Sequence, residues 1–154
     1  MVRHINTSSN KHIKAIISKF ELKSLLMINK NSNDFSSYNL ISISNDNFIT
    51  QDEYKKFNSV LRIHFWDDID NETIKKIIKF SSKDNLIIHC DAGESRSATV
   101  AMAITYNKCL KKLDEYNFEK FSKECSILQN VRYTPNMEVF KKIVNYYKQH
   151  YIKI

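Results

Sequence analysis

The sequence predicts an α/β domain in which a mostly parallel central sheet is flanked by helices. Short apolar segments typical of strands alternate with longer amphipathic segments typical of helices, as in parallel strands joined by helical crossovers. The chain has 154 residues, which fits one domain, residues 1–154, with a core of its own. Hydrophobic residues make up 42% and aromatic residues 12% of the chain, which is typical of a globular protein.

In the first half of the chain the pattern predicts one helix followed by three strands. Ser9–Phe20 places isoleucines on one helical face and follows hydroxyl residues that can cap a helix. Ser24–Asn29 and Asn39–Ser44 are short apolar segments with the composition of strands. Val60–Phe65 alternates apolar with polar side chains, which predicts a half-buried strand.

In the second half of the chain the pattern predicts four helices and one buried strand. Asn71–Lys83 and Asn136–Ile152 carry apolar side chains at helical spacing, so each should bury one face. Asn85–His89 is an apolar strand, and Ser97–Leu110 is a helix whose alanines allow close packing. Asp114–Cys125 is the remaining predicted helix.

Glycine and proline are almost absent, with one residue of each, Gly93 and Pro135. Ordinary usage would give about ten glycines and eight prolines at this length. Collagen-like, proline-rich and Gly/Ser-linker architectures are therefore excluded. Glycine-rich dinucleotide-binding and nucleoside-triphosphate-binding loops are excluded too, because each needs at least two glycines. Asn and Asp must make most of the turns, for example in the loop-like stretches 30–37 and 44–52.

The net charge and the cysteine content indicate which partners and which cellular compartment to expect. The net charge is +7. The lysines are scattered along the chain, which indicates a solvated surface. The alternative is that the positive charge attracts phosphoproteins, nucleic acid or lipid headgroups. The chain has three cysteines without CxxC spacing, which predicts a reduced, cytoplasmic protein without a structural zinc site. We expect no export signal and no membrane span, because the apolar runs are short.

One segment combines the features of an anion-binding site. An apolar strand ends at His89, a short loop runs from Cys90 to Arg96, and a helix starts at about Ser97. Backbone N–H groups of such a loop point inward, and the helix N-terminus adds positive potential. The amides expected to line this site belong to Asp91, Ala92, Gly93, Glu94, Ser95 and Arg96.

Three side-chain positions of this loop suggest its chemistry. Gly93 lies mid-loop, where left-handed backbone or close approach to a ligand favours glycine. Arg96 offers a planar fork that matches two phosphate oxygens. Cys90 stands at the mouth of the loop, where the amides, the helix dipole and Arg96 all favour the nucleophilic thiolate.

The pattern His89-Cys90-x5-Arg96-Ser97 resembles the signature of the cysteine-dependent protein tyrosine phosphatases, and most of all their compact dual-specificity-like branch. The resemblance extends from about Val60 to Asn136 and implies a phosphatase-like fold. It implies hydrolysis of phosphate monoesters on phosphorylated proteins through a phosphocysteine on Cys90, with Arg96 and the loop amides holding the phosphate. It implies no metal and no organic cofactor.

The resemblance also implies a general acid on a loop upstream of the signature. Asp68 is the first choice, because Asp68-Ile69 matches segments of related phosphatases, and Asp67 is a close second. Asp70 is instead expected to cap the helix that follows it.

Further residues are expected to support the loop. His89 should orient Cys90 or the loop, and Ser97 should donate to the sulfur. Asn136, after Pro135, is expected to cap the last helix and, as the resemblance implies, to brace the loop with its side chain, since both roles can hold together. Cys109 and Cys125 are interpreted as small apolar core residues, and a redox role for them is the less favoured alternative.

Two acids in the loop, Asp91 and Glu94, depart from a purely basic site. Their charge should weaken binding of a dianion, and it argues against a polyphosphorylated lipid as substrate. An RNA 5′-phosphatase of the same superfamily, a non-catalytic phosphate-binding module and a sulfurtransferase are the alternatives. Replacement of Gly93 by alanine is expected to impair phosphate binding more than stability.

Overall fold

The computed structural model describes residues 12–28, 35–112 and 118–152, and it contains a four-stranded sheet with the strand order β1-β4-β2-β3. All three strand pairings are parallel. The strands are β1 (Ile13–Ser18), β2 (Asn39–Ile43), β3 (Ser59–Ile63) and β4 (Leu86–Cys90). The predicted α/β class with a parallel sheet is therefore confirmed.

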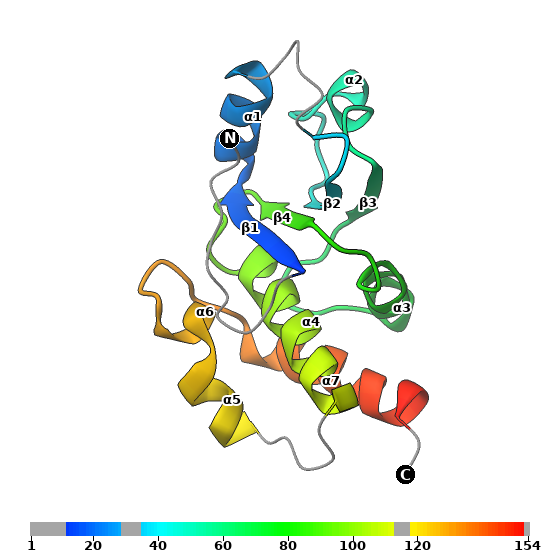
Figure 1. Cartoon of the computed structure of the whole chain (residues 1–154), viewed down its shortest axis with the longest axis vertical. Helices are drawn as coiled ribbons and strands as arrows, with labels where there is room; N and C mark the ends of the chain where they lie inside the picture. The colour runs from blue at the N-terminus through cyan, green and yellow to red at the C-terminus, as the bar shows by residue number, and fades with distance from the viewer. Residues whose placement is uncertain (1–11, 29–34, 113–117, 153–154) are drawn as a thin grey trace.

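Helices cover both faces of this sheet (Figure 1). On one face lie α1 (Lys19–Ile28) and α2 (Gln51–Tyr54). The opposite layer contains the remaining helices: α3 (Asn71–Phe80), α4 (Arg96–Lys112), α5 (Phe118–Glu124), α6 (Ser126–Gln129) and α7 (Met137–Tyr151). A sheet covered on both faces requires strands that are apolar almost throughout, as β2 and β4 are.

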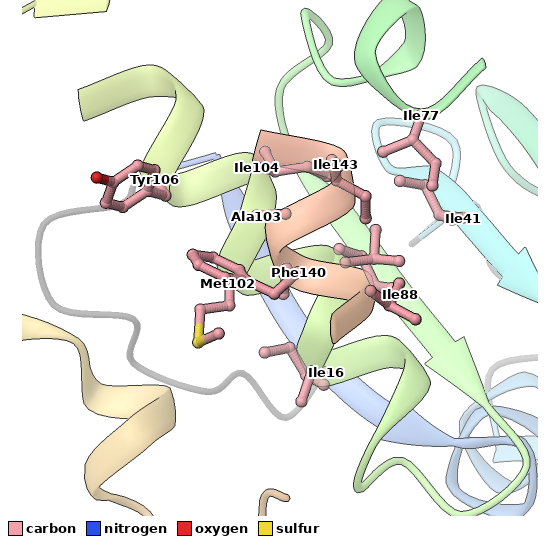
Figure 2. Close-up of a cluster of buried hydrophobic side chains, with 14 of the residues drawn as sticks. Ile16, Ile41, Ile77, Ile88, Met102, Ala103, Ile104, Tyr106, Phe140 and Ile143 are labelled. Atoms are coloured by element: carbon pink, nitrogen blue, oxygen red, sulfur yellow. The ribbon is translucent and has the colours of Figure 1, made fainter. Parts of the chain in front are cut away.

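The larger core lies between the sheet, α4 and α7 (Figure 2). Ile16 of β1, Ile88 of β4 and Ile143 of α7 belong to this core, and all three side chains are completely buried. Ala103 of α4 is also fully buried, so the alanine-rich helix lies close to its neighbours. This arrangement fixes α4, the helix that starts at Arg96, against the sheet.

The prediction for the N-terminal segment is wrong at two elements. Residues 13–18 of the predicted helix Ser9–Phe20 form strand β1, and residues 24–28 of the predicted strand Ser24–Asn29 belong to helix α1. The isoleucines of β1 fit helical spacing only because this strand is buried on both faces. Residues 19 and 20 of the predicted helix belong to α1, and residues 9–11 and 29 lie outside the described residues.

Helix α1 begins with a capping box that sequence analysis missed. Glu21 N–H donates to Ser18 Oγ at 3.0 Å, and Ser18 N–H donates to Glu21 Oε1 at 3.1 Å. The spacing Ser-x-x-Glu is a known signal for a helix start. It could have placed the boundary between β1 and α1 correctly.

The other predicted elements agree with the structure to within a few residues where they are described. The start of the predicted helix Asp114–Cys125 lies outside the described residues, and α5 covers its second half. The short helices α2 and α6 were not predicted. Asn85 adopts a left-handed backbone with φ 54°, as expected of a chain that makes its turns with Asn.

Candidate active site

The candidate site lies where β4 ends and α4 begins. Cys90 is the last residue of β4 and Arg96 is the first residue of α4, so residues 91–95 form the whole connection. Cys90 is paired in register with Ser18 at the end of β1. The loop therefore stands at the carboxyl edge of the parallel sheet, where open α/β folds bind ligands.

The sulfur of Cys90 is buried and surrounded by hydrogen-bonding groups. The residue is 2% exposed, and its thiol donates to Ser97 Oγ at 3.1 Å. Gly93 N–H donates to Sγ at 3.2 Å. Both groups can donate to a negatively charged sulfur, because a hydroxyl hydrogen rotates to suit its partner. The structure thus brings Cys90, Gly93 and Ser97 together.

Gly93 meets two steric conditions at once. Its φ is +71°, a conformation that side chains rarely adopt. A Cβ added there would lie 2.5 Å from Ser18 N and 2.6 Å from Ile17 C. The close approach is therefore to the chain's own backbone at the end of β1. This contact ties the loop to the sheet, so the expectation that Gly93 matters more for phosphate binding than for stability is revised below.

Arg96 is held above the loop by two contacts. Its Nη2 donates to Asp91 Oδ2 at 3.1 Å, and its Cζ lies 4.1 Å from the centroid of the Trp66 ring. Nη1 is buried and has no hydrogen-bond partner among the described residues. A buried guanidinium N–H without an acceptor is costly, so this group is available to an oxygen of a bound anion.

His89 is completely buried beneath the loop. Ser42 Oγ lies 2.6 Å from its Nε2 and 2.8 Å from the Tyr54 hydroxyl, and Nδ1 lies 3.4 Å from the carbonyl oxygen of Cys90. Burial lowers the pKa of His89 to about 4. The imidazole is therefore neutral near pH 7 and connects the Cys90 backbone to β2.

The segment before α7 supports the loop through its backbone. Thr134 N–H donates to the Glu94 carbonyl at 2.9 Å. Asn136 N–H donates to Thr99 Oγ1 at 2.8 Å, and that hydroxyl donates to the Ser95 carbonyl at 2.7 Å. The side chain of Asn136 accepts from the first turn of α7 and caps that helix. Of the two readings of Asn136, the structure supports the cap, and the support of the loop comes from its main chain.

The three candidate acids have different surroundings. Asp70 caps α3 by accepting from Thr73 N–H at 2.8 Å, as expected. Asp68 is exposed and accepts from Lys142 Nζ on α7 at 2.5 Å, which lowers the pKa of its carboxyl group. Asp67 follows Trp66, whose ring lies on Arg96. Among the described contacts, none joins Asp68 to the loop of residues 91–95.

Sequence reasoning missed several residues of the site or left their role open. Sequence patterns assign no role to Thr99, Thr134 or Ser42, and they do not place Trp66 beside Arg96. Their contacts with the loop come from elements far away in sequence, which local patterns do not reveal. Only Thr99 lies near the motif, one helical turn after Ser95, where a hydroxyl commonly bonds a preceding carbonyl.

Three further features concern metal binding, membrane spans and the state of the cysteines. Within residues 12–28, 35–112 and 118–152, no cluster of three or more His, Cys, Asp or Glu side chains could hold a metal ion. Over the same ranges, no helix is both long and apolar enough to cross a membrane. Cys90, Cys109 and Cys125 are free thiols, and burial raises the pKa of Cys125.

Solved structures of other proteins share the fold of this chain. The chain has the fold of tyrosine and dual-specificity phosphatases, which confirms the predicted phosphatase-like architecture. A scan against protein-family models and a search of curated proteins each found no match.

The individual structural neighbours cover nearly the whole chain at low sequence identity. DUSP15 has a TM-score of 0.58 and 18% identity, over 94% of this chain and 87% of that chain. The Yvh1 phosphatase domain from Chaetomium thermophilum has a TM-score of 0.57 and 15% identity, over 93% and 94%. OH1 from the Orf virus, described as a tyrosine phosphatase, has a TM-score of 0.55 and 16% identity, over 91% and 83%.

Replacing Gly93 by alanine should destabilise the protein, because the added Cβ must displace the backbone of Ile17 and Ser18. We expect a loss of about 2 kcal/mol or more, or roughly 4–8 °C in Tm. Thermal denaturation measures this, with Asn85→Gly as the control at the other left-handed position and a change of less than about 1 kcal/mol. An unchanged Tm for Gly93→Ala would contradict the steric account.

His89 should make stability depend on pH. Its folded pKa of about 4 lies below the ordinary 6.5, so the unfolded chain takes up the proton first as the pH falls. The contribution is complete above about pH 6.5 and is lost as the pH falls toward 4, costing about 2 kcal/mol by pH 5. Urea denaturation at pH 7 and pH 5 should show a smaller difference for His89→Asn than for wild type. Equal differences would mean that His89 is not buried in its neutral form.

Proposed function

We propose that this protein is a phosphoric monoester hydrolase that works through a phosphocysteine on Cys90, and specifically a protein tyrosine or dual-specificity phosphatase. One observation carries the proposal. A buried thiol lies at the base of a loop whose Gly93 amide points at the sulfur, while a buried N–H of Arg96 has no acceptor among the residues that the structure describes. This is the arrangement needed to hold a tetrahedral oxyanion against a nucleophilic sulfur.

The reaction then has two steps. The Cys90 thiolate attacks phosphorus, an S–P bond forms, and the bond from phosphorus to the ester oxygen breaks. The amides of residues 91–96 and the Arg96 guanidinium hold the three remaining oxygens. A water molecule next attacks phosphorus, phosphate leaves, and the sulfur departs as thiolate stabilised by the Ser97 hydroxyl, which lies 3.1 Å away.

A general acid must protonate the leaving ester oxygen in the first step and take the proton from water in the second. The hydrogen bond from Lys142 lowers the pKa of Asp68 and favours its ionised form, whereas the acid must start protonated. Asp67 directly follows Trp66, whose ring lies on Arg96. We therefore favour Asp67 for this role, and Asp68, the first choice from sequence, is the alternative.

A phosphorylated protein is the substrate that these surroundings favour. Trp66 is 56% exposed and lies beside Arg96, so it offers an aromatic surface to a phosphotyrosine ring or a peptide. The acids Asp91 and Glu94 in the loop disfavour a polyphosphorylated lipid. RNA 5′-phosphate hydrolysis is the alternative within the same chemistry, and a panel of phosphopeptides and 5′-triphosphate RNA distinguishes the two.

Replacing Cys90 by serine should abolish hydrolysis of p-nitrophenyl phosphate, because a serine hydroxyl is a far weaker nucleophile at neutral pH. We expect at least a 10³-fold lower kcat, measured from p-nitrophenolate release. Cys109→Ser is the matched control and should retain wild-type activity. Equal rates for wild type and Cys90→Ser would exclude the covalent mechanism. A wild type that binds phosphate but never turns over would indicate a non-catalytic module.

The two acid candidates can be separated by kinetics. Asp67→Asn should lower kcat by roughly 10²–10⁴-fold with little change in phosphate affinity, and Asp68→Asn should have a much smaller effect. Lys142→Met removes the hydrogen-bond partner of Asp68. The basic limb of the pH–rate profile reports the pKa of the general acid, so this substitution should leave that limb unchanged if Asp67 is the acid. The reverse pattern would assign the role to Asp68.

A further inference from the structure

Two acids in a loop that binds a dianion need neutralising partners, and the structure supplies them for Asp91. Its Oδ2 accepts from Arg96 Nη2 at 3.1 Å, and its Oδ1 lies 3.7 Å from Lys19 Nζ. Asp91 therefore lies between two cations. One of them, Arg96, is also the residue that the proposed function assigns to phosphate.

Lys19 is fixed beside the loop by several contacts. It is the first residue of α1, and its backbone N–H donates to the Asp91 carbonyl at 3.3 Å. Its Nζ donates to Asp46 Oδ2 at 3.2 Å and lies 5.3 Å from the centroid of the Phe48 ring. The side chain is 19% exposed. Lys19 is thus a partly buried cation at the edge of the candidate site.

We propose that Lys19 and Asp91 together set the affinity of the loop for phosphate. In the absence of an anion, Asp91 accepts a hydrogen bond from Nη2 of the Arg96 guanidinium. When a tetrahedral oxyanion enters, it shares Arg96 with Asp91, and repulsion between the two anions weakens binding. Lys19 offsets the charge of Asp91 and so strengthens phosphate binding without touching the ligand. This inference rests on the proposed function, because it assumes that the loop holds a phosphate.

A purely structural role of Asp91 leads to the opposite expectation. If Asp91 served only to orient Arg96, its negative charge would be needed for a well-placed guanidinium. Removing that charge would then weaken anion binding or leave it unchanged. Asp91→Asn separates the two roles, because asparagine keeps an oxygen that can accept from Arg96 while it removes the charge.

The sole tryptophan of the chain allows a binding assay that does not depend on catalysis. Trp66 is the only tryptophan, and its ring lies 4.1 Å from Arg96 Cζ. Titration with tungstate, an inert tetrahedral oxyanion, can be followed by Trp66 fluorescence and by calorimetry. We expect Asp91→Asn to bind tungstate about five- to tenfold more tightly than wild type and Lys19→Gln about five- to tenfold more weakly.

Lys23→Gln is the matched control, because Lys23 lies one turn further along α1 and donates instead to Glu53 Oε1 at 2.6 Å. It should bind tungstate as wild type does. The double variant Lys19→Gln/Asp91→Asn removes one charge of each sign, so it should bind tungstate within about twofold of wild type, because the Coulomb energies of separate charges add.

The outcomes separate this inference from the proposed function. If wild type binds no tungstate, the proposed phosphate site is wrong and this inference fails with it. If wild type binds but Lys19→Gln equals Lys23→Gln, or Asp91→Asn binds more weakly than wild type, only the roles assigned to Lys19 and Asp91 are overturned. A double variant that binds as weakly as Lys19→Gln would also overturn the role assigned to Asp91.

Discussion

The contact between Gly93 and the end of β1 is the constraint on which the site depends. The loop must turn within five residues from a buried strand into a buried helix, and only a residue without Cβ fits against Ile17 and Ser18. From this position the Gly93 amide reaches the Cys90 sulfur. The strand order matters for the same reason, because β1 lies beside β4 and supplies the surface against which the loop is built.

Neutral groups lie below the loop, and charged groups lie above it. Beneath it, His89 and Ser42 form a buried hydrogen bond, and burial keeps His89 uncharged near pH 7. Above it, Arg96 lies between Trp66 and Asp91. Because the lower layer carries no charge, the binding of an anion is governed by the upper layer.

An element or a site residue could be predicted when the residues that indicate it are adjacent in the sequence. The motif from His89 to Ser97 predicted β4, the loop and the start of α4, because strand, turn and helix signals are adjacent in the sequence. Strand β1 was mistaken for a helix, since its burial on both faces depends on helices elsewhere in the chain. Lys19 and Trp66 could not be assigned to the site, because the fold brings them to Asp91 and Arg96 from distant segments.

The central claim is that residues 91–96 form a cradle for a tetrahedral oxyanion directly above the Cys90 sulfur. A crystal structure of the protein soaked with tungstate tests this most directly. We expect tungsten next to Sγ, tungstate oxygens within hydrogen-bond distance of the loop amides, and Arg96 Nη1 bonded to one of them. An ordered loop that stays empty at saturating tungstate, or tungstate bound only elsewhere on the protein, would contradict the account.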